Sequence, residues 1–143
     1  MTTVSSSNEK ASLPTVSSSN EKANLPVVVI IGGGFAGLNA AKTLADAPVK
    51  VILVDRSNHH LFQPLLYQVA TAGLSPAEIA SPIRNVLRGY PTVEVALAEA
   101  TEIDKKEKFV RVAGGQAFSF EYLLVATGAT HAYFGHPEWE RHA

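Results

Sequence analysis

The chain has 143 residues, 46% of them hydrophobic, with no cysteine and a formal net charge of −1. This composition is typical of a single soluble globular unit of the intracellular type, and it excludes the strongly basic balance expected of a nucleic-acid-binding protein. The apolar run from Val27 to Ile31 is far too short to span a bilayer, and no secretory signal sequence precedes it.

The chain begins with a tandem duplication. The unit TVSSSNEKASLP is followed at once by TVSSSNEKANLP, and the two copies differ at one position. Serine-rich copies with few apolar side chains bury too little surface to offset the entropy lost on ordering them. We therefore predict a disordered tail over residues 1–26 and a folded domain over residues 27–143.

A strand, a helix and a second strand are predicted next. Val27 to Ile31 is a β-branched run typical of a parallel strand covered on both faces. A second such run, Val51 to Val54, is closed by Asp55. Between the two strands, apolar side chains recur at helical spacing before Pro48, at Phe35, Leu38, Ala41 and Leu44. The three elements predict a right-handed βαβ unit.

The turn that enters this helix reads GGGFAG and contains the pattern G-x-G-x-x-G. Gly32 permits a tight turn, Gly34 lets a pyrophosphate approach the backbone, and Gly37 lets the helix pack closely on the strand. The first N–H groups of the helix, around Phe35 and Ala36, lack partners within the helix and attract phosphate. Because the pattern lies between a predicted strand and a predicted helix, it predicts a dinucleotide site.

The acid that closes the second strand bears on which dinucleotide binds. Asp55 lies 18 residues beyond Gly37, where a carboxylate can accept hydrogen bonds from ribose hydroxyls. A carboxylate at this position disfavours a 2′-phosphate, so NADP is the poorest candidate. NAD and FAD both stay open from the βαβ unit alone.

The rest of the chain departs from simple βα alternation. We expect one helical region, Ser75 to Arg88, and then a further buried strand, Tyr122 to Ala126, after a group of short strands. Turn residues separate these short strands and predict a small antiparallel meander. Its expected strands are Val93 to Leu97, Thr101 to Ile103, Phe109 to Val112 and Ala117 to Phe120. The predicted fold class is α/β, a Rossmann-like parallel sheet with an inserted antiparallel β-meander.

Local signals mark the middle of the chain. Pro64 suits the first position of a short helix, where its missing N–H costs nothing. Ser75-Pro76-Ala77-Glu78 is a capping box, which we interpret as structural. His59 and His60 have no third ligand at metal spacing, so we expect loop hydrogen bonds rather than a metal site.

Two longer segments carry a resemblance to a known family. The order of elements resembles the FAD domain of the two-dinucleotide-fold flavoprotein reductases, in which a strand ending in A-T-G-A follows the meander. Residues 126–129 have this sequence. NHHLFQPLLYQVATAGLSPAEIASP, at residues 58–82, and ATGATHAYFGHPEW, at residues 126–139, are similar to type II NADH dehydrogenase, the non-proton-pumping NADH:quinone oxidoreductase.

The resemblance implies FAD as the cofactor and NADH as the substrate. Without cysteine, electrons would pass from the flavin directly to an acceptor such as quinone, with Gln63 and Pro64 facing the flavin ring and Ala100 near the adenine. The expected cofactor-binding residues are Gly32, Gly34, Phe35, Ala36, Gly37, Asp55, Gln63, Pro64, Ala100, Ala126, Thr127 and Gly128. No catalytic residue and no metal ligand is expected in this chain.

Members of the family are longer than this chain. A second dinucleotide domain binds NADH, a return segment completes the FAD domain, and C-terminal helices hold the enzyme on the cytoplasmic side of the inner membrane. We therefore expect residues 27–143 to be the N-terminal part of an incomplete FAD-binding domain, cytoplasmic by itself and unable to complete turnover alone. Membrane contact would be peripheral and through further residues, and a homodimer is left open. A non-catalytic nucleotide-binding module and an inactive remnant are the alternatives.

Overall fold

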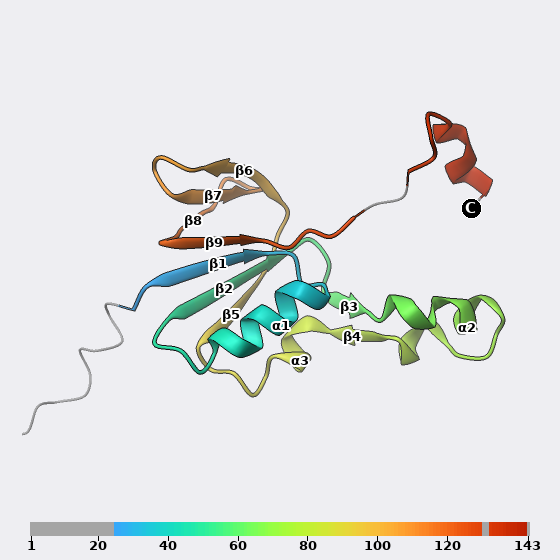
Figure 1. Cartoon of the computed structure of the whole chain (residues 1–143), viewed down its shortest axis with the longest axis horizontal. Helices are drawn as coiled ribbons and strands as arrows, with labels where there is room; N and C mark the ends of the chain where they lie inside the picture. The colour runs from blue at the N-terminus through green and yellow to red at the C-terminus, as the bar shows by residue number, and fades with distance from the viewer. Residues whose placement is uncertain (1–24, 130–131, 143) are drawn as a thin grey trace, which may run out of the picture.

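The computed structural model describes residues 25–129 and 132–142, and it centres on a four-stranded parallel sheet (Figure 1). The strand order is β5-β2-β1-β9, with β1 at Val27–Ile31, β2 at Lys50–Asp55, β5 at Val93–Leu97 and β9 at Tyr122–Val125. The predicted strands on either side of the glycine-rich turn are thus confirmed. Of the disordered tail predicted over residues 1–26, residues 1–24 lie outside the described residues, and the Pro26 carbonyl accepts a hydrogen bond from the Lys50 N–H at 2.9 Å.

Helices cover one face of this sheet. Helix α1, Phe35–Leu44, follows the glycine-rich turn, and the short helix α3, Ile83–Val86, packs beside it. Alternate residues of β1 point to opposite faces, as the pleat requires. The buried side chains on the helical face are Val28, Ile30, Leu38, Ala41, Val51, Leu53, Ile83 and Leu87.

An antiparallel meander covers the other face. It consists of β6, Ala100–Asp104, β7, Phe109–Val112, and β8, Ala117–Ser119, in that order. The Asp104 carboxylate accepts hydrogen bonds from the backbone N–H groups of Lys106 (2.8 Å) and Glu107 (2.9 Å), which fixes the first turn. The buried side chains on this face are Val29, Ile31, Ile52, Val54, Val110, Val112, Phe118 and Phe120.

One predicted member of the meander belongs elsewhere. Val93–Leu97 is not part of it but pairs in parallel with β2, with Leu53 opposite Val95. The assignment to the meander was wrong because an apolar strand carries no sign of the direction of its partner. Val95 and Ala96 pack on opposite faces of the parallel sheet instead.

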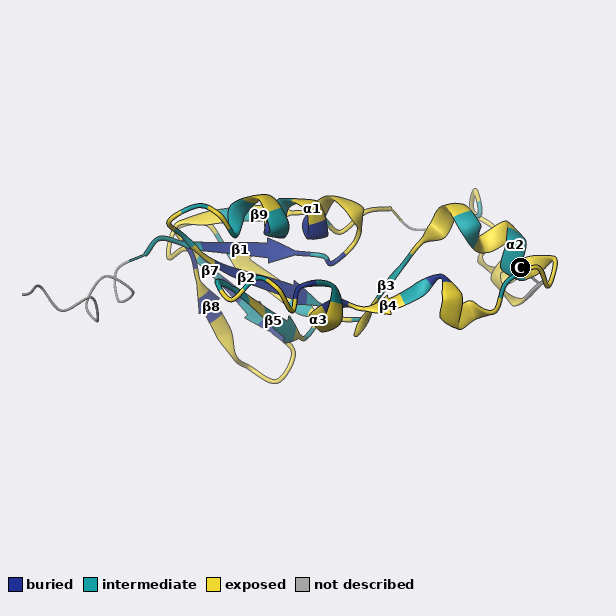
Figure 2. Ribbon diagram, turned by 90° about the horizontal axis from the view of Figure 1, so that it is seen from below, coloured by how far each residue is buried: buried dark blue, intermediate teal, exposed yellow. Residues whose placement is uncertain are grey.

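Residues 59–82, here called the arm, extend away from the sheet (Figure 2). The base of the arm is a two-stranded antiparallel ribbon of β3, His59–Leu61, and β4, Ala80–Pro82. Beyond the base lie the 3₁₀ turns η2, Gln63–Leu65, and η3, Pro76–Glu78, and the short helix α2, Leu66–Ala70. None of the residues of η2, α2 and η3 is buried.

The helix predicted from Ser75 to Arg88 is wrong as a single element. Its capping box is present, with the Ser75 N–H donating to Glu78 Oε2 at 2.6 Å, but it begins only one 3₁₀ turn. Pro82 lacks an N–H and biases Ser81 toward an extended backbone, so the chain enters β4 instead. Pro64 was predicted at the first position of a short helix; it lies in the first turn of η2, but at its second position after Gln63.

The strand predicted from Tyr122 to Ala126 forms as β9, but it is not buried. It pairs only with β1 and is an edge of the sheet among the described residues. Tyr122 is 64% exposed and Val125 is 56% exposed. The apolar composition reflects a parallel strand, whereas burial depends on neighbours that the described residues do not provide. No described helix is both long and apolar enough to cross a bilayer.

Candidate dinucleotide site

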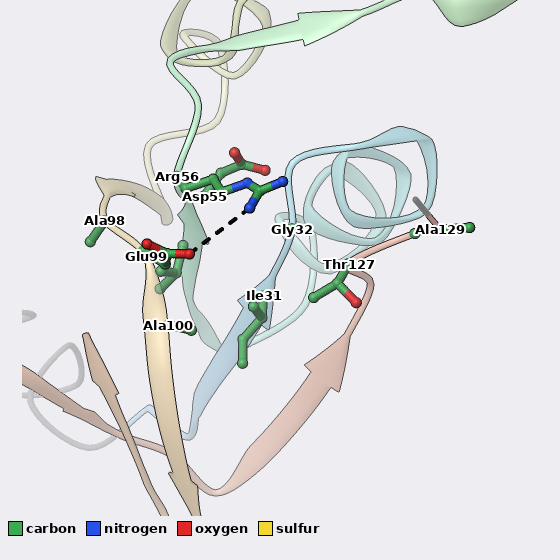
Figure 3. Close-up of a pocket in the computed structure, with 11 residues that line it drawn as sticks. Ile31, Gly32, Asp55, Arg56, Ala98, Glu99, Ala100, Thr127 and Ala129 are labelled. Atoms are coloured by element: carbon green, nitrogen blue, oxygen red, sulfur yellow. Dashed lines mark ion pairs between the residues drawn. The ribbon is translucent and has the colours of Figure 1, made fainter. Parts of the chain in front are cut away.

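A cavity of about 500 Å³ opens at the carboxyl ends of the parallel strands (Figure 3). The chain runs from β1 to β2 and β5 on one side and returns to β9 on the other, so the strand order reverses at β1. Ligands of open α/β sheets bind in the crevice at such a reversal. The residues that line the cavity are Ile31, Gly32, Val54, Asp55, Arg56, Ala98, Glu99, Ala100, Thr127, Gly128 and Ala129.

Two of the three patterned glycines are required by the fold itself. Gly32 has a φ of +107°, and a Cβ there would collide with the carbonyl oxygen of Ala126. A Cβ on Gly37 would collide with the carbonyl oxygen of Gly32. The tight turn and the close helix packing that the pattern predicts are therefore both present.

The third glycine differs from the other two. Gly34 has an ordinary extended backbone, with φ −74° and ψ −165°, and a Cβ added to it would meet no atom within 4 Å. The fold therefore does not need glycine at this position. The open space next to its backbone is what a closely approaching diphosphate would require.

The start of α1 is electrostatically suited to an anion. Gly34 is the N-cap, no side chain caps the helix, and no acidic residue lies in the first turn. The first helical hydrogen bond runs from the Leu38 N–H to the Gly34 carbonyl at 3.0 Å. The N–H groups that precede it have no intrahelical acceptor, and the helix dipole adds partial positive charge.

Asp55 ties the end of β2 to the glycine-rich turn. Its Oδ2 accepts a hydrogen bond from the Gly33 N–H at 2.5 Å, and its Oδ1 accepts one from the Ser57 N–H at 2.6 Å. An ionised carboxylate has about four lone-pair sites, so both oxygens keep capacity for further donors such as ribose hydroxyls. The carboxylate thus has a structural role beside the binding role predicted for it.

An ion pair lies at the rim of the cavity. Arg56 Nη1 and Glu99 Oε1 are 3.9 Å apart, and both side chains are largely exposed (Figure 3). Arg56 was not predicted as a site residue. Its position directly after Asp55, at the carboxyl end of a parallel strand, was the available signal.

The predicted cofactor-binding residues fall into three groups. Those that line the cavity are Gly32, Asp55, Ala100, Thr127 and Gly128. Those that surround the glycine-rich turn without lining the cavity are Gly34, Phe35, Ala36, Gly37 and Ala126. Gln63 and Pro64 lie on the arm and do not line it.

The two adjacent histidines lie at the base of the arm. His60 Nδ1 contacts the Gly33 carbonyl oxygen at 3.3 Å, so the predicted loop hydrogen bond is confirmed for this residue. Phe35 packs edge-on against the ring of His60, with the centroids 4.8 Å apart. Among the residues that the structure describes, no three potential ligands gather in a way that could hold a metal ion.

Comparison with known proteins places the chain among related sequences. Residues 26–143 match the family model described as pyridine nucleotide-disulphide oxidoreductase. The type II NADH:quinone oxidoreductase Ndh of Mycobacterium tuberculosis is 49% identical over 119 residues, which are 81% of this chain and 26% of that protein. NdhA of the same organism is 46% identical over 115 residues, 78% of this chain and 24% of that protein. The chain spans about a quarter of the length of these curated relatives.

Solved structures share the fold. NDH2 from Plasmodium falciparum, solved in complex with NADH, superposes with a TM-score of 0.73 at 22% identity, covering 82% of this chain and 25% of that chain. The sulfide:quinone oxidoreductase of Aquifex aeolicus superposes with a TM-score of 0.69 at 25% identity, covering 76% and 25%. The Rossmann-like α/β class with an antiparallel insertion is thereby confirmed.

Proposed function

The chain belongs to the pyridine nucleotide-disulphide oxidoreductase family, and we propose that it is the FAD-binding part of a NADH:quinone oxidoreductase. The observation that carries this proposal is the cavity at the strand-order reversal, beside an uncapped helix start and an open Gly34. The identity of 49% to a mycobacterial type II NADH:quinone oxidoreductase supports the choice of reaction.

The residues of the chain suit the parts of FAD in turn. The uncapped start of α1 would hold the diphosphate, with Gly34 allowing close approach. The Asp55 carboxylate would accept hydrogen bonds from the ribose hydroxyls, and the backbone around Ala100 would border the adenine. Thr127 and Gly128 would close the opposite wall of the cavity.

The arm would serve the flavin end of the cofactor. Gln63 and Pro64 begin η2 on the arm and do not line the cavity that contains Asp55, and we propose that they border the flavin ring. Bound FAD would supply the two-electron chemistry that links NADH oxidation to quinone reduction. The chain's own contribution is to bind and orient the cofactor.

Turnover would need more than these residues. The sequence contains G-x-G-x-x-G once, at Gly32 to Gly37, and we assign that pattern to FAD. We therefore expect no NADH:quinone turnover by the 143-residue chain, because it offers no second pattern of this kind for NADH. We also expect its FAD binding to be weak. Peripheral membrane contact and a homodimer stay predictions of the resemblance.

Substitution of Gly34 tests the binding proposal. Gly34→Val introduces a side chain into open space on an extended backbone, so it should not strain the fold. It should nevertheless weaken FAD binding at least about tenfold, because the valine occupies the approach of the diphosphate. Binding is measured by titrating FAD into the chain and following flavin fluorescence, with thermal unfolding as the check on folding.

Gly89→Val is the matched control. Gly89 is also an exposed glycine whose added Cβ would meet no atom within 4 Å, and it lies outside the cavity. This variant should bind FAD like the original chain. Equal FAD affinity in the Gly34 and Gly89 variants, or no FAD binding by the original chain, would contradict the proposal.

A further inference from the structure

Both backbone polar groups of Gly33 have a partner, and the space where its side chain would lie is closed. Its N–H donates to Asp55 Oδ2 at 2.5 Å, and its carbonyl oxygen lies 3.3 Å from His60 Nδ1. A Cβ added to Gly33 would come within 2.5 Å of Ile83 Cδ1, so the Ile83 side chain closes that side of the residue. Gly33 is buried, so these contacts replace water around its backbone.

The contact with His60 comes from a separate structural unit, the base of the arm. His60 and Phe62 are alternate residues at the start of the arm, and both rings meet Phe35, the first residue of α1, edge-on. The centroid distances are 4.8 Å to His60 and 5.4 Å to Phe62. Two residues of the arm therefore contact the first residue of α1. His60 also contacts the Gly33 carbonyl in the turn that precedes this helix.

The direction of this hydrogen bond is fixed by chemistry. A carbonyl oxygen only accepts hydrogen bonds, so a hydrogen bond between these two atoms requires the proton on His60 Nδ1. The ring then acts as a donor to the Gly33 carbonyl, and its Nε2 is the acceptor when the ring is neutral.

The Gly33 carbonyl and the Gly34 N–H belong to the same peptide group. This peptide is trans, as are all described peptides, so the two bonds point in opposite directions in one plane. A donor that holds the carbonyl toward the arm consequently aims the Gly34 N–H away from the arm. Gly34 itself is exposed and borders open space.

We propose that His60 is a positioning residue that orients the Gly34 N–H for the diphosphate of a bound dinucleotide. The inference rests on the proposed function for the identity of the ligand. His60 acts through the Gly33 peptide and does not line the cavity. The base of the arm and the diphosphate site are thereby coupled through one hydrogen bond.

Two substitutions separate the donor from the ring. His60→Phe keeps an aromatic ring against Phe35 and removes the donor. His60→Asn removes the ring and keeps an N–H donor the same number of bonds from Cα as Nδ1. FAD titrated into the full chain should bind about five- to tenfold more weakly to the Phe variant, and within about threefold of the original affinity to the Asn variant.

The matched control is His59→Asn, since His59 is the exposed neighbour of His60 and should leave FAD binding unchanged. If His60 acted only through its ring contact with Phe35, the His60→Asn variant would bind FAD more weakly than the His60→Phe variant. That order, equal weakening by both variants, or an unchanged Phe variant would each overturn the proposal.

A measurement without ligand keeps the proposal testable if a variant does not fold or if the original chain binds no FAD. Long-range ¹H–¹⁵N correlation of the unmodified chain at a pH of about 8.5, where free histidine is neutral, reports the tautomer. We expect the proton of His60 on Nδ1. A proton on Nε2 would refute the positioning role, whereas a failure of FAD binding alone would refute the proposed function.

Discussion

Replacing Asp55 by alanine should destabilise the ligand-free chain by about 2–4 kcal/mol. The substitution removes the acceptor of two short hydrogen bonds, from the N–H groups of Gly33 at 2.5 Å and Ser57 at 2.6 Å. Gly33 is buried, so its N–H loses its partner without gaining water, which costs about 1–3 kcal/mol. Ser57 is half-buried, so water can partly replace the acceptor, and its share is about 1 kcal/mol.

The assay is urea unfolding followed by circular dichroism at 25 °C without any nucleotide. Asp46→Ala is the matched control, because Asp46 is an exposed acid and its replacement should change the unfolding free energy by less than about 0.5 kcal/mol. If Asp55→Ala costs no more than the control, the carboxylate does not hold the turn. The FAD affinity of Asp55→Ala should also fall, because the carboxylate that would accept hydrogen bonds from the ribose hydroxyls is lost. This affinity is measured without urea, where the variant is folded.

Two further substitutions test the packing and the surface. Gly37→Ala should destabilise the chain by about 2–4 kcal/mol in thermal or urea unfolding, because its Cβ would collide with the Gly32 carbonyl; a stabilised variant, as helix propensity alone would give, would contradict the close packing. Glu94→Gln should change the unfolding free energy by less than about 0.5 kcal/mol, because the Lys50–Glu94 ion pair, though 3.1 Å long, is half exposed. A larger loss in urea unfolding would show that the pair is more than a surface contact.

The βαβ unit could be predicted from the sequence because each of its signals is local. Val27 to Ile31 is apolar throughout because both faces of the parallel sheet are covered, and β1 has the predicted bounds. The clash of a Gly32 Cβ with the Ala126 carbonyl is a distant contact that the sequence does not show, whereas the positive φ of Gly32 and the clash of a Gly37 Cβ with the Gly32 carbonyl both act within one turn. The turn residues of the meander were predictable for the same reason, as Asp104 closes its own turn.

Features that depend on distant partners were predicted less well. The partner of Val93–Leu97 is β2, about 40 residues earlier, and no local pattern names it. The arm forms because His59–Leu61 pairs with Ala80–Pro82, which overrides the helix expected after the capping box. The exposure of β9 likewise depends on what lies beside it.

The parts of the candidate site that could be predicted are those where the residue type itself indicates the chemistry. Glycines in a strand-to-helix turn and an acid at a strand end give such an indication, and the cavity is lined by Gly32 and Asp55. His60 was predicted only to make a loop hydrogen bond, because its acceptor, the Gly33 carbonyl, lies 27 residues away. Arg56 was missed although it directly follows Asp55 at the carboxyl end of β2, because the sequence does not show that it meets Glu99 at the rim of the cavity.

The open side of β9 has a consequence for the behaviour of the protein in solution. Tyr122–Val125 contains no charged residue and no proline, the usual devices that stop a strand from recruiting another. Among the described residues only β1 pairs with β9, so the outer backbone groups of β9 can template a fifth strand from any chain that offers one. Addition of strands to β9 would make the protein self-associate as its concentration rises. A β-strand peptide that pairs with the outer backbone groups of β9 would keep the protein monodisperse.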